Sequence, residues 1–155
     1  MTIQKISKNI FYEFRKKFSK GEKRWVPSRF DEYFYVDNDN TIEVEDWIGC
    51  NKDLFRLNQG NVFRNSKEAI NHRKKLNTIA VVVNYCWDKG LAKEWEIGQN
   101  NYYIYLDGED KELDYSINYT CKSLMILPYL ISRDACEQLM KEKKKELKII
   151  FEVNN

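Results

Sequence analysis

The sequence has 155 residues, of which 43% are hydrophobic and 14% are aromatic, and its 26 Lys and Arg residues nearly balance its 24 Asp and Glu residues. This composition is typical of a globular chain and excludes a fully disordered one, and the length fits one domain or two very small units that share a core. The net charge of +2 excludes a protein held to nucleic acid by a uniformly basic surface.

Residues 1–22 form the first segment, and their apolar positions are spaced as on one face of a helix. We expect an amphipathic helix that ends near Gly21, because glycine accepts the left-handed conformation of a helix C-terminus. The alternative is a flexible basic arm that becomes ordered only on a partner. The apolar positions are Ile3, Ile6, Ile10, Phe14 and Phe18.

A β-hairpin is predicted next. Tyr33–Val36 and Thr41–Val44 are rich in residues that favour strands, and they flank the turn-forming run Asp37–Asn40. A short strand at Arg24–Val26 is expected to precede the hairpin.

The rest of the first unit, residues 23–90, is expected to contain a third strand near Leu54–Leu57 and then a long helix. Gly60 and Asn61 indicate a turn between them. Ser66 is the predicted N-cap of the helix, and Gly90 is its predicted end.

The second unit, residues 91–155, repeats this plan. An acidic turn at Asp107–Asp110 separates its first two predicted strands, and Ser132 is the expected N-cap of a last helix with a charged middle. The strands are expected at Tyr102–Leu106, Leu113–Tyr119 and Ser123–Leu130.

The two units also match in sequence. Tyr33–Asp37 parallels Tyr103–Asp107, and Phe63–Ala69 parallels Tyr129–Ala135. One such unit cannot bury both its sheet face and its helix stripe. We therefore predict one coupled α+β domain, in which two tandem units of β-hairpin or strand plus helix form antiparallel sheet packed by helices. A chance likeness between hairpins followed by capped helices is the alternative.

Several runs occur together in a distinctive order from about residue 20 to residue 151. They are Lys20-Gly21-Glu22-Lys23, Asp53-Leu54-Phe55-Arg56, Gly60-Asn61-Val62-Phe63, Ser66-Lys67-Glu68-Ala69, Tyr102-Tyr103-Ile104-Tyr105 and Tyr129 to Ala135. This arrangement resembles a family of small, mostly uncharacterised phage and prophage proteins of low-GC bacteria. The chain departs from the family pattern at Glu68, which Ala69 follows directly, and at Ile126–Tyr129.

The resemblance implies an accessory gene of a mobile element and supplies no catalytic residue. Small phage accessory proteins commonly act by binding, and some inhibit host defence. By this analogy we expect a non-catalytic inhibitor of a host defence protein or nucleoprotein complex, most concretely an anti-CRISPR protein that blocks a Cas effector.

Acidic residues supply the first candidate binding surface. The segment from Asp31 to Asp53 holds eight Asp and Glu residues and one lysine. Such a surface could mimic nucleic acid and occupy a basic groove, and an ordinary solvated hairpin is the alternative. The candidate residues on the two acidic hairpins are Asp37, Asp39, Glu43, Glu45, Asp46, Asp107, Glu109 and Asp110.

Basic residues interleaved with aromatics crowd the first 25 positions and supply the second candidate. This mix suits direct contact with RNA or single-stranded DNA, which is the alternative function, and it equally suits a helix whose aromatic stripe packs in a core or a partner groove. The candidate residues are Arg15, Lys16, Lys17, Lys20, Arg24 and Trp25.

The family-like run offers a third candidate, a surface recognition loop formed by Asp53, Arg56, Gly60 and Asn61. In the simpler interpretation, Asp53 and Arg56 form an ion pair at a strand end, and Gly60 and Asn61 make a turn with positive φ.

No metal, cofactor or catalytic centre is predicted. The four cysteines form no CxxC pair, His72 is the single histidine, and the run from Asp37 lacks the glycine and glutamate of a calcium loop. The sequence shows neither a secretory signal nor an apolar run long enough to span a bilayer. We therefore expect reduced thiols in a protein of the bacterial cytoplasm.

Overall fold

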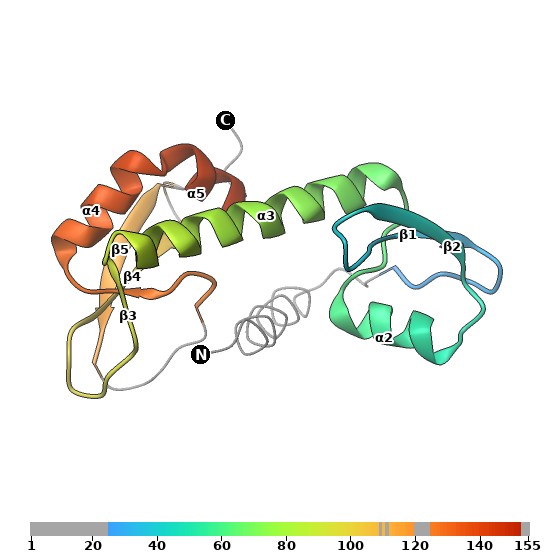
Figure 1. Ribbon diagram of the computed structural model, residues 1–155, viewed down its shortest axis with the longest axis horizontal. Coiled ribbons are helices and arrows are strands. Elements are labelled where there is room, and N and C mark those ends of the chain that lie inside the picture. Colours follow the sequence, from blue (N-terminus) through green and yellow to red (C-terminus); the bar gives the residue numbers. More distant parts are fainter. Residues whose placement is uncertain (1–24, 109, 111, 120–124, 153–155) are drawn as a thin grey trace. The chain divides into compact units, whose positions relative to one another are not determined.

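The structure is a computed structural model that describes residues 25–108, 110, 112–119 and 125–152 (Figure 1). These residues form helices and two antiparallel sheets, so the predicted α+β class is confirmed. They divide into two units, one ending at Lys74 and the other beginning at Lys75. The helix or arm expected over residues 1–22 lies outside the described residues.

The first unit contains the predicted hairpin. Strands β1 (Glu32–Val36) and β2 (Ile42–Asp46) pair antiparallel, with Phe34 opposite Val44. In the turn, the Asp37 N–H donates to the Thr41 carbonyl at 2.9 Å. The run of Asp and Asn residues thus acts as the tight connection that its composition predicts.

Helix α2 (Asn51–Gln59) replaces the strand expected near Leu54–Leu57. The Asp53 carboxylate accepts the backbone N–H of Cys50 at 3.1 Å and thereby stabilises the first turn of the helix. Gly60, at φ +82°, ends the helix in the left-handed conformation. A short run of Leu and Phe fits strand and helix equally well, and here the capping residues at both ends select the helix.

The strand expected at Arg24–Val26 is also wrong for its described part. Residues 25–28 belong to no strand. The Trp25 ring instead packs, half-buried, against a hydrophobic cluster formed by Tyr33, Tyr35, Trp47 and Val62.

Helix α3 (Ser66–Asp88) begins in the first unit and ends in the second. The side chain of Asn65 accepts the Glu68 N–H at 3.0 Å, so the N-cap lies one residue before the predicted Ser66. The helix ends before Gly90, as predicted, where φ is +66°. Its most buried apolar side chains are those of Ala69, Ile79, Val82 and Cys86.

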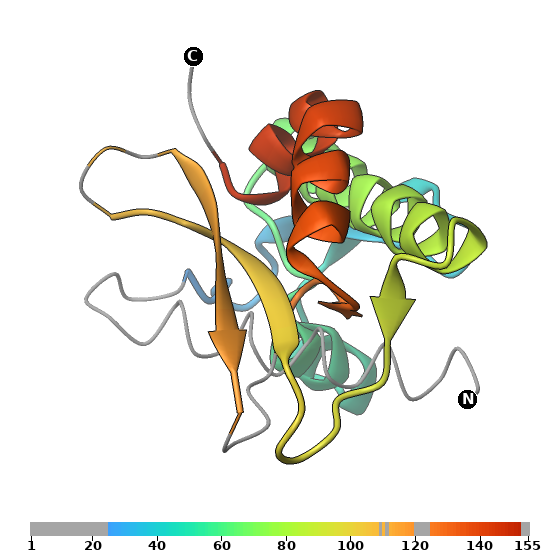
Figure 2. The ribbon, with the colours of Figure 1, turned by 90° about the vertical axis from the view of Figure 1, so that its left-hand side faces the viewer.

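The second unit contains a four-stranded sheet with the order β3-β6-β4-β5 (Figure 2). The predicted hairpin is confirmed as β4 and β5. In the described part of the expected strand Ser123–Leu130, residues 125–128 belong to no strand and β6 begins at Tyr129. Pro128 stands directly before β6 and has no backbone N–H for a sheet, which explains the late start of the strand. The bounds are β3 (Ala92–Lys93), β4 (Asn101–Leu106), β5 (Leu113–Asn118) and β6 (Tyr129–Leu130).

Two helices follow where one was expected. Helix α4 (Arg133–Glu142) packs against β4, β5 and β6, and α5 (Lys144–Ile150) follows after a break at Lys143. The Ser132 hydroxyl accepts the Ala135 N–H at 3.1 Å, which confirms the predicted cap.

The two units share a topology that supports the predicted repeat. In each, the first hairpin strand also pairs, on its other edge, with the residues that lead into a capped helix. Phe34 bridges Phe63 in the first unit, and Tyr102 pairs with Leu130 in the second. The first unit differs by the added helix α2, and the second by the added strand β3.

Asn101 holds the loop before β4, and its side chain is fully buried. Its amide nitrogen donates to the carbonyls of Glu96, Gln99 and Asn118, and its oxygen accepts the Glu96 N–H. We expect Asn101→Ala to lower the free energy of unfolding by about 2 to 3 kcal/mol in urea titrations, because the buried amide is lost and several backbone groups lose their partner.

The neighbouring Asn100 is exposed and supplies a matched control. Asn100→Ala should change the free energy of unfolding by no more than about 0.5 kcal/mol. Equal effects from the two substitutions would contradict the role given to the Asn101 side chain.

Candidate functional site

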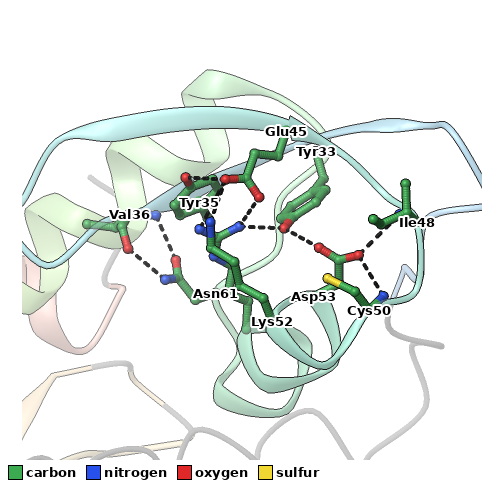
Figure 3. A network of polar contacts seen from close by, with 10 residues as sticks. Tyr33, Tyr35, Val36, Glu45, Ile48, Cys50, Lys52, Asp53 and Asn61 are labelled. Carbon is green, nitrogen blue, oxygen red and sulfur yellow. Dashed lines mark hydrogen bonds and ion pairs between the residues drawn. The ribbon is translucent and has the colours of Figure 1, made fainter.

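A chain of polar contacts joins the β1–β2 hairpin to α2 in the first unit (Figure 3). The Tyr33 hydroxyl donates to Asp53 Oδ1 at 2.8 Å and accepts from Arg56 Nη1 at 2.7 Å. Asp53 and Arg56 are only 1% and 6% exposed. The two residues predicted as a surface pair therefore lie inside the unit, and a tyrosine hydroxyl bridges them.

Glu45 continues the chain on β2. Its carboxylate accepts from Arg56 Nη1 at 2.5 Å, from Lys52 Nζ at 2.8 Å and from the Tyr35 hydroxyl at 3.0 Å. The Arg56 guanidinium carbon also lies 3.3 Å from the centre of the Tyr35 ring. Arg56 is thus held by a carboxylate, a hydroxyl and an aromatic face at once.

Asp53 closes the other end of the chain. Its second oxygen accepts the backbone N–H groups of Ile48 and Cys50, each at 3.1 Å (Figure 3). One buried carboxylate therefore fixes both the connection after β2 and the start of α2. The contacts together orient the hairpin on the helix.

The surroundings shift the pKa values of both carboxyl groups downward. The hydrogen bond from Arg56 lowers the pKa of Glu45 to about 2. Burial acts to raise the pKa of Asp53, but the hydrogen bonds from Tyr33 and from the Cys50 and Ile48 amides together bring it below its usual value. Both groups are charged at neutral pH, and folding favours the charged form.

These shifts predict acid sensitivity of the first unit. A carboxyl group with a lowered folded-state pKa stabilises the fold above its unfolded pKa, about 4. That contribution is lost as the pH falls through the folded pKa, which is about 2 for Glu45. Unfolding followed by tryptophan fluorescence should show the free energy of unfolding falling between about pH 5 and about pH 2. Glu45→Gln should flatten this dependence, and an equal slope in the variant would contradict the assignment.

Gly60 and Asn61 make the turn that the simpler interpretation predicts. The Asn61 side chain also braces β1, because its oxygen accepts the Val36 N–H at 2.8 Å and its amide donates to the Val36 carbonyl at 2.7 Å. The four residues of the expected recognition loop therefore serve the internal structure of the first unit.

The first acidic hairpin keeps most of its predicted carboxylates at the surface. Side chains opposite each other on paired strands share a face, so Glu45 lies with Tyr33 and turns toward α2. Glu45 is half-buried, whereas six neighbours remain exposed: Asp31, Glu32, Asp37, Asp39, Glu43 and Asp46.

The second acidic turn belongs to the other unit. The Asp107 N–H donates to the Glu112 carbonyl at 2.8 Å, and Asp110 accepts the Glu112 N–H at 2.9 Å. Glu109 lies outside the described residues. The turn is the hairpin connection that the sequence predicts.

Of the basic candidates, only Trp25 is described; Arg15, Lys16, Lys17, Lys20 and Arg24 lie outside the described residues. The Trp25 ring packs against the hydrophobic cluster of the first unit, and the Arg64 guanidinium carbon lies 5.6 Å from its centre. The structure gives Trp25 a packing role.

Within the described ranges, no group of three or more His, Cys, Asp or Glu residues could hold a metal ion. Cys50 is an exposed free thiol, and Cys86 and Cys136 are buried free thiols. Burial raises the pKa of Cys86 to about 11 and that of Cys136 to about 12. None of the described helices has the length and apolar character needed to cross a bilayer.

Comparison of the chain with known proteins identifies no similar protein. Scans against protein-family models, curated proteins and solved structures each found no match. The exposed carboxylates and the buried contacts beneath them are thus the observations that bear on function.

The sequence patterns do not single out Tyr33 and Tyr35, although both complete the buried contacts. A signal for them exists in the hairpin register. Once Tyr33 is placed opposite Glu45 and Tyr35 opposite Glu43, two phenols and two carboxylates share one face.

Proposed function

We propose that the chain is a phage-encoded, non-catalytic protein whose acidic first hairpin binds a basic surface of a host defence complex. In its most concrete form it is an anti-CRISPR protein that blocks the nucleic-acid groove of a Cas effector. The phage origin rests on the family-like runs of the sequence. The observation that supports the binding mode is the set of six exposed carboxylates on and beside β1 and β2.

The charge of these carboxylates is directed to solvent. In the part of the chain that the structure describes, the ion pairs of this region involve Glu45, and none involves the six exposed carboxylates. Their summed negative potential favours encounter with a cationic surface and disfavours direct binding to nucleic acid.

The density of charge on the hairpin is close to that of a nucleic-acid strand. A strand rises about 3.3 Å per residue, so residues 31–46 fold into a hairpin about 25 Å long. Six charges over this length give about one per 4 Å, compared with about one per 3.4 Å along a single nucleic-acid strand. A groove lined by Lys and Arg would therefore meet a comparable field.

A pull-down with the full-length chain tests this function. The bait variant carries Glu32→Gln, Asp37→Asn, Glu43→Gln and Asp46→Asn, and the lysate comes from a CRISPR-bearing host and is treated with nuclease. We expect the wild-type chain to recover the effector. The variant should bind with an affinity about thirtyfold lower and be recovered with much less effector, because four exposed charge contacts contribute about 0.5 kcal/mol each.

The matched control removes the same number of charges from the second unit, through Asp88→Asn, Glu94→Gln, Glu96→Gln and Glu137→Gln. This control should bind like the wild-type chain. Equal recovery by the hairpin variant would contradict the proposed surface. Recovery only without nuclease would instead favour direct nucleic-acid binding.

A further inference from the structure

Helix α2 has an inverted polarity. Its buried residues are Asp53 and Arg56, whereas Leu54 is 44% exposed and Phe55 is 62% exposed. A surface helix normally places its apolar side chains toward the core and its charged ones toward water. The polar contacts to the hairpin occupy much of the inner face, which Leu57 shares by packing against the hydrophobic cluster, and Leu54 and Phe55 are left outside.

Two more exposed apolar residues, Phe30 and Ile48, lie on segments that hydrogen bonds connect to each other and to helix α2. Phe30 is 66% exposed and donates its N–H to the Trp47 carbonyl at 2.7 Å; Ile48 is 58% exposed and donates its N–H to Asp53. These bonds link the three segments that carry the exposed side chains. We call the set the α2 patch: Phe30, Ile48, Leu54 and Phe55.

Phe30 has an unusual backbone conformation. Its φ is +70°, in the left-handed region that large residues rarely occupy and that costs about 1 kcal/mol or more. The bond to Trp47 holds this conformation, and the ring stays largely exposed. The Asp31 N–H also donates to the Ser28 carbonyl at 3.0 Å, so a four-residue turn accounts for the positive φ of Phe30, and the exposed ring adds a second aromatic side chain to the exposed apolar set.

We propose that residues 1–24 of the same chain bind the α2 patch. This segment contains eight Lys and Arg residues and two Glu residues, together with apolar positions that include Ile10, Phe14 and Phe18. The patch offers the complementary chemistry, because the exposed Asp31 follows Phe30 directly in the chain and the exposed Asp46 lies two residues before Ile48.

The attachment point favours binding within one molecule. The segment joins the first unit at Trp25, whose ring packs against the cluster that contains Trp47, the residue bonded to Phe30. A segment of this length reaches about 36 Å even when fully helical. A short tether gives an effective concentration of about 1 mM, so a weak contact is well populated.

This inference does not depend on the proposed function, since both partners in the contact belong to this chain. It has a consequence for that function, however. A basic segment bound beside the acidic hairpin would compete with a basic partner, so the chain would regulate its own surface.

A nitroxide spin label on Cys50 of the full chain tests the contact. Cys50 is the exposed thiol beside the patch, Cys121→Ser removes one competing thiol, and burial with a raised pKa keeps Cys86 and Cys136 unreactive. We expect the label to reduce the amide signals of residues 6–18 by about half or more, because the tethered contact is well populated. Phe55→Asp should restore these signals, whereas Ile97→Asp, at an exposed site of the second unit, should not.

Three outcomes would overturn the proposal. These are unchanged signals in the labelled wild-type chain, signal loss that persists with Phe55→Asp, and loss seen only when labelled and isotope-enriched molecules are mixed. The last result would assign the patch to a second copy. A control experiment without the label excludes an effect of the nitroxide itself. In the unlabelled chain, the double substitution Phe14→Asp with Phe18→Asp should shift the amide resonances of residues 48–56. Unchanged resonances would count against the contact.

Discussion

Replacing Arg56 with alanine is expected to lower the free energy of unfolding by about 3 to 5 kcal/mol, one of the two largest effects of a single substitution in the first unit. The side chain is almost fully buried and contacts Glu45, the Tyr33 hydroxyl and the Tyr35 ring. Its loss leaves a partly buried carboxylate without its main partner. Urea unfolding followed by tryptophan fluorescence measures the change, since Trp25 and Trp47 report on this unit.

Lys52→Ala is the matched control for Arg56→Ala. Lys52 contacts the same Glu45 carboxylate at 2.8 Å, but its side chain is 60% exposed. Exposed ion pairs contribute little, so this substitution should have only a small part of the Arg56 effect. Comparable losses from both variants would show that the Glu45 charge, rather than the buried position of Arg56, determines stability.

Asp53→Ala is expected to lower the free energy of unfolding by about 3 to 4 kcal/mol. The substitution leaves the Tyr33 hydroxyl and the amides of Ile48 and Cys50 without their acceptor. Because these groups set the start of α2, circular dichroism of the variant should also show a loss of helix. The experiment combines urea unfolding with far-ultraviolet spectra.

The exposed Asp46 gives the comparison for Asp53→Ala, since it is a carboxylate of the same unit, at the end of β2. Asp46→Ala should alter stability by no more than about 0.5 kcal/mol and leave the helix signal unchanged. An Asp53 variant as stable as the Asp46 variant would refute the capping role.

Local chemistry explains which elements could be predicted from the sequence. The Asp37–Asn40 turn, the Ser132 cap and the end of α3 before Gly90 each depend on residues within a few positions of one another. Such short-range signals are readable without knowledge of the fold.

Helix α2 and its contacts could not be predicted in this way. Tyr33 and Asp53 are 20 residues apart, and Arg56 and Glu45 are 11 apart, so their bonds exist only after the hairpin packs on the helix. The apolar run Leu54–Leu57 is compatible with a strand when it is considered alone. The helix is explained by the contacts that bury Asp53 and Arg56 on its inner face.

The sequence predicts the negative charge of the acidic candidate site, but not which of its carboxylates stay exposed. The sequence places eight carboxylates between Asp31 and Asp53. Which carboxylates stay exposed for binding depends on the strand register and on the position of α2. Both place Glu45 and Asp53 in contacts inside the unit. The remaining six form the surface on which the proposed function rests.

The most direct test of that function is a binding titration of the full-length chain against a purified, guide-loaded Cas effector, with and without target DNA in its groove. We expect binding to the free effector, affinity about thirtyfold lower for the four-residue hairpin variant, and loss of binding when target DNA is already bound. Absence of binding to the effector, or equal binding with its groove filled, would contradict the proposed function.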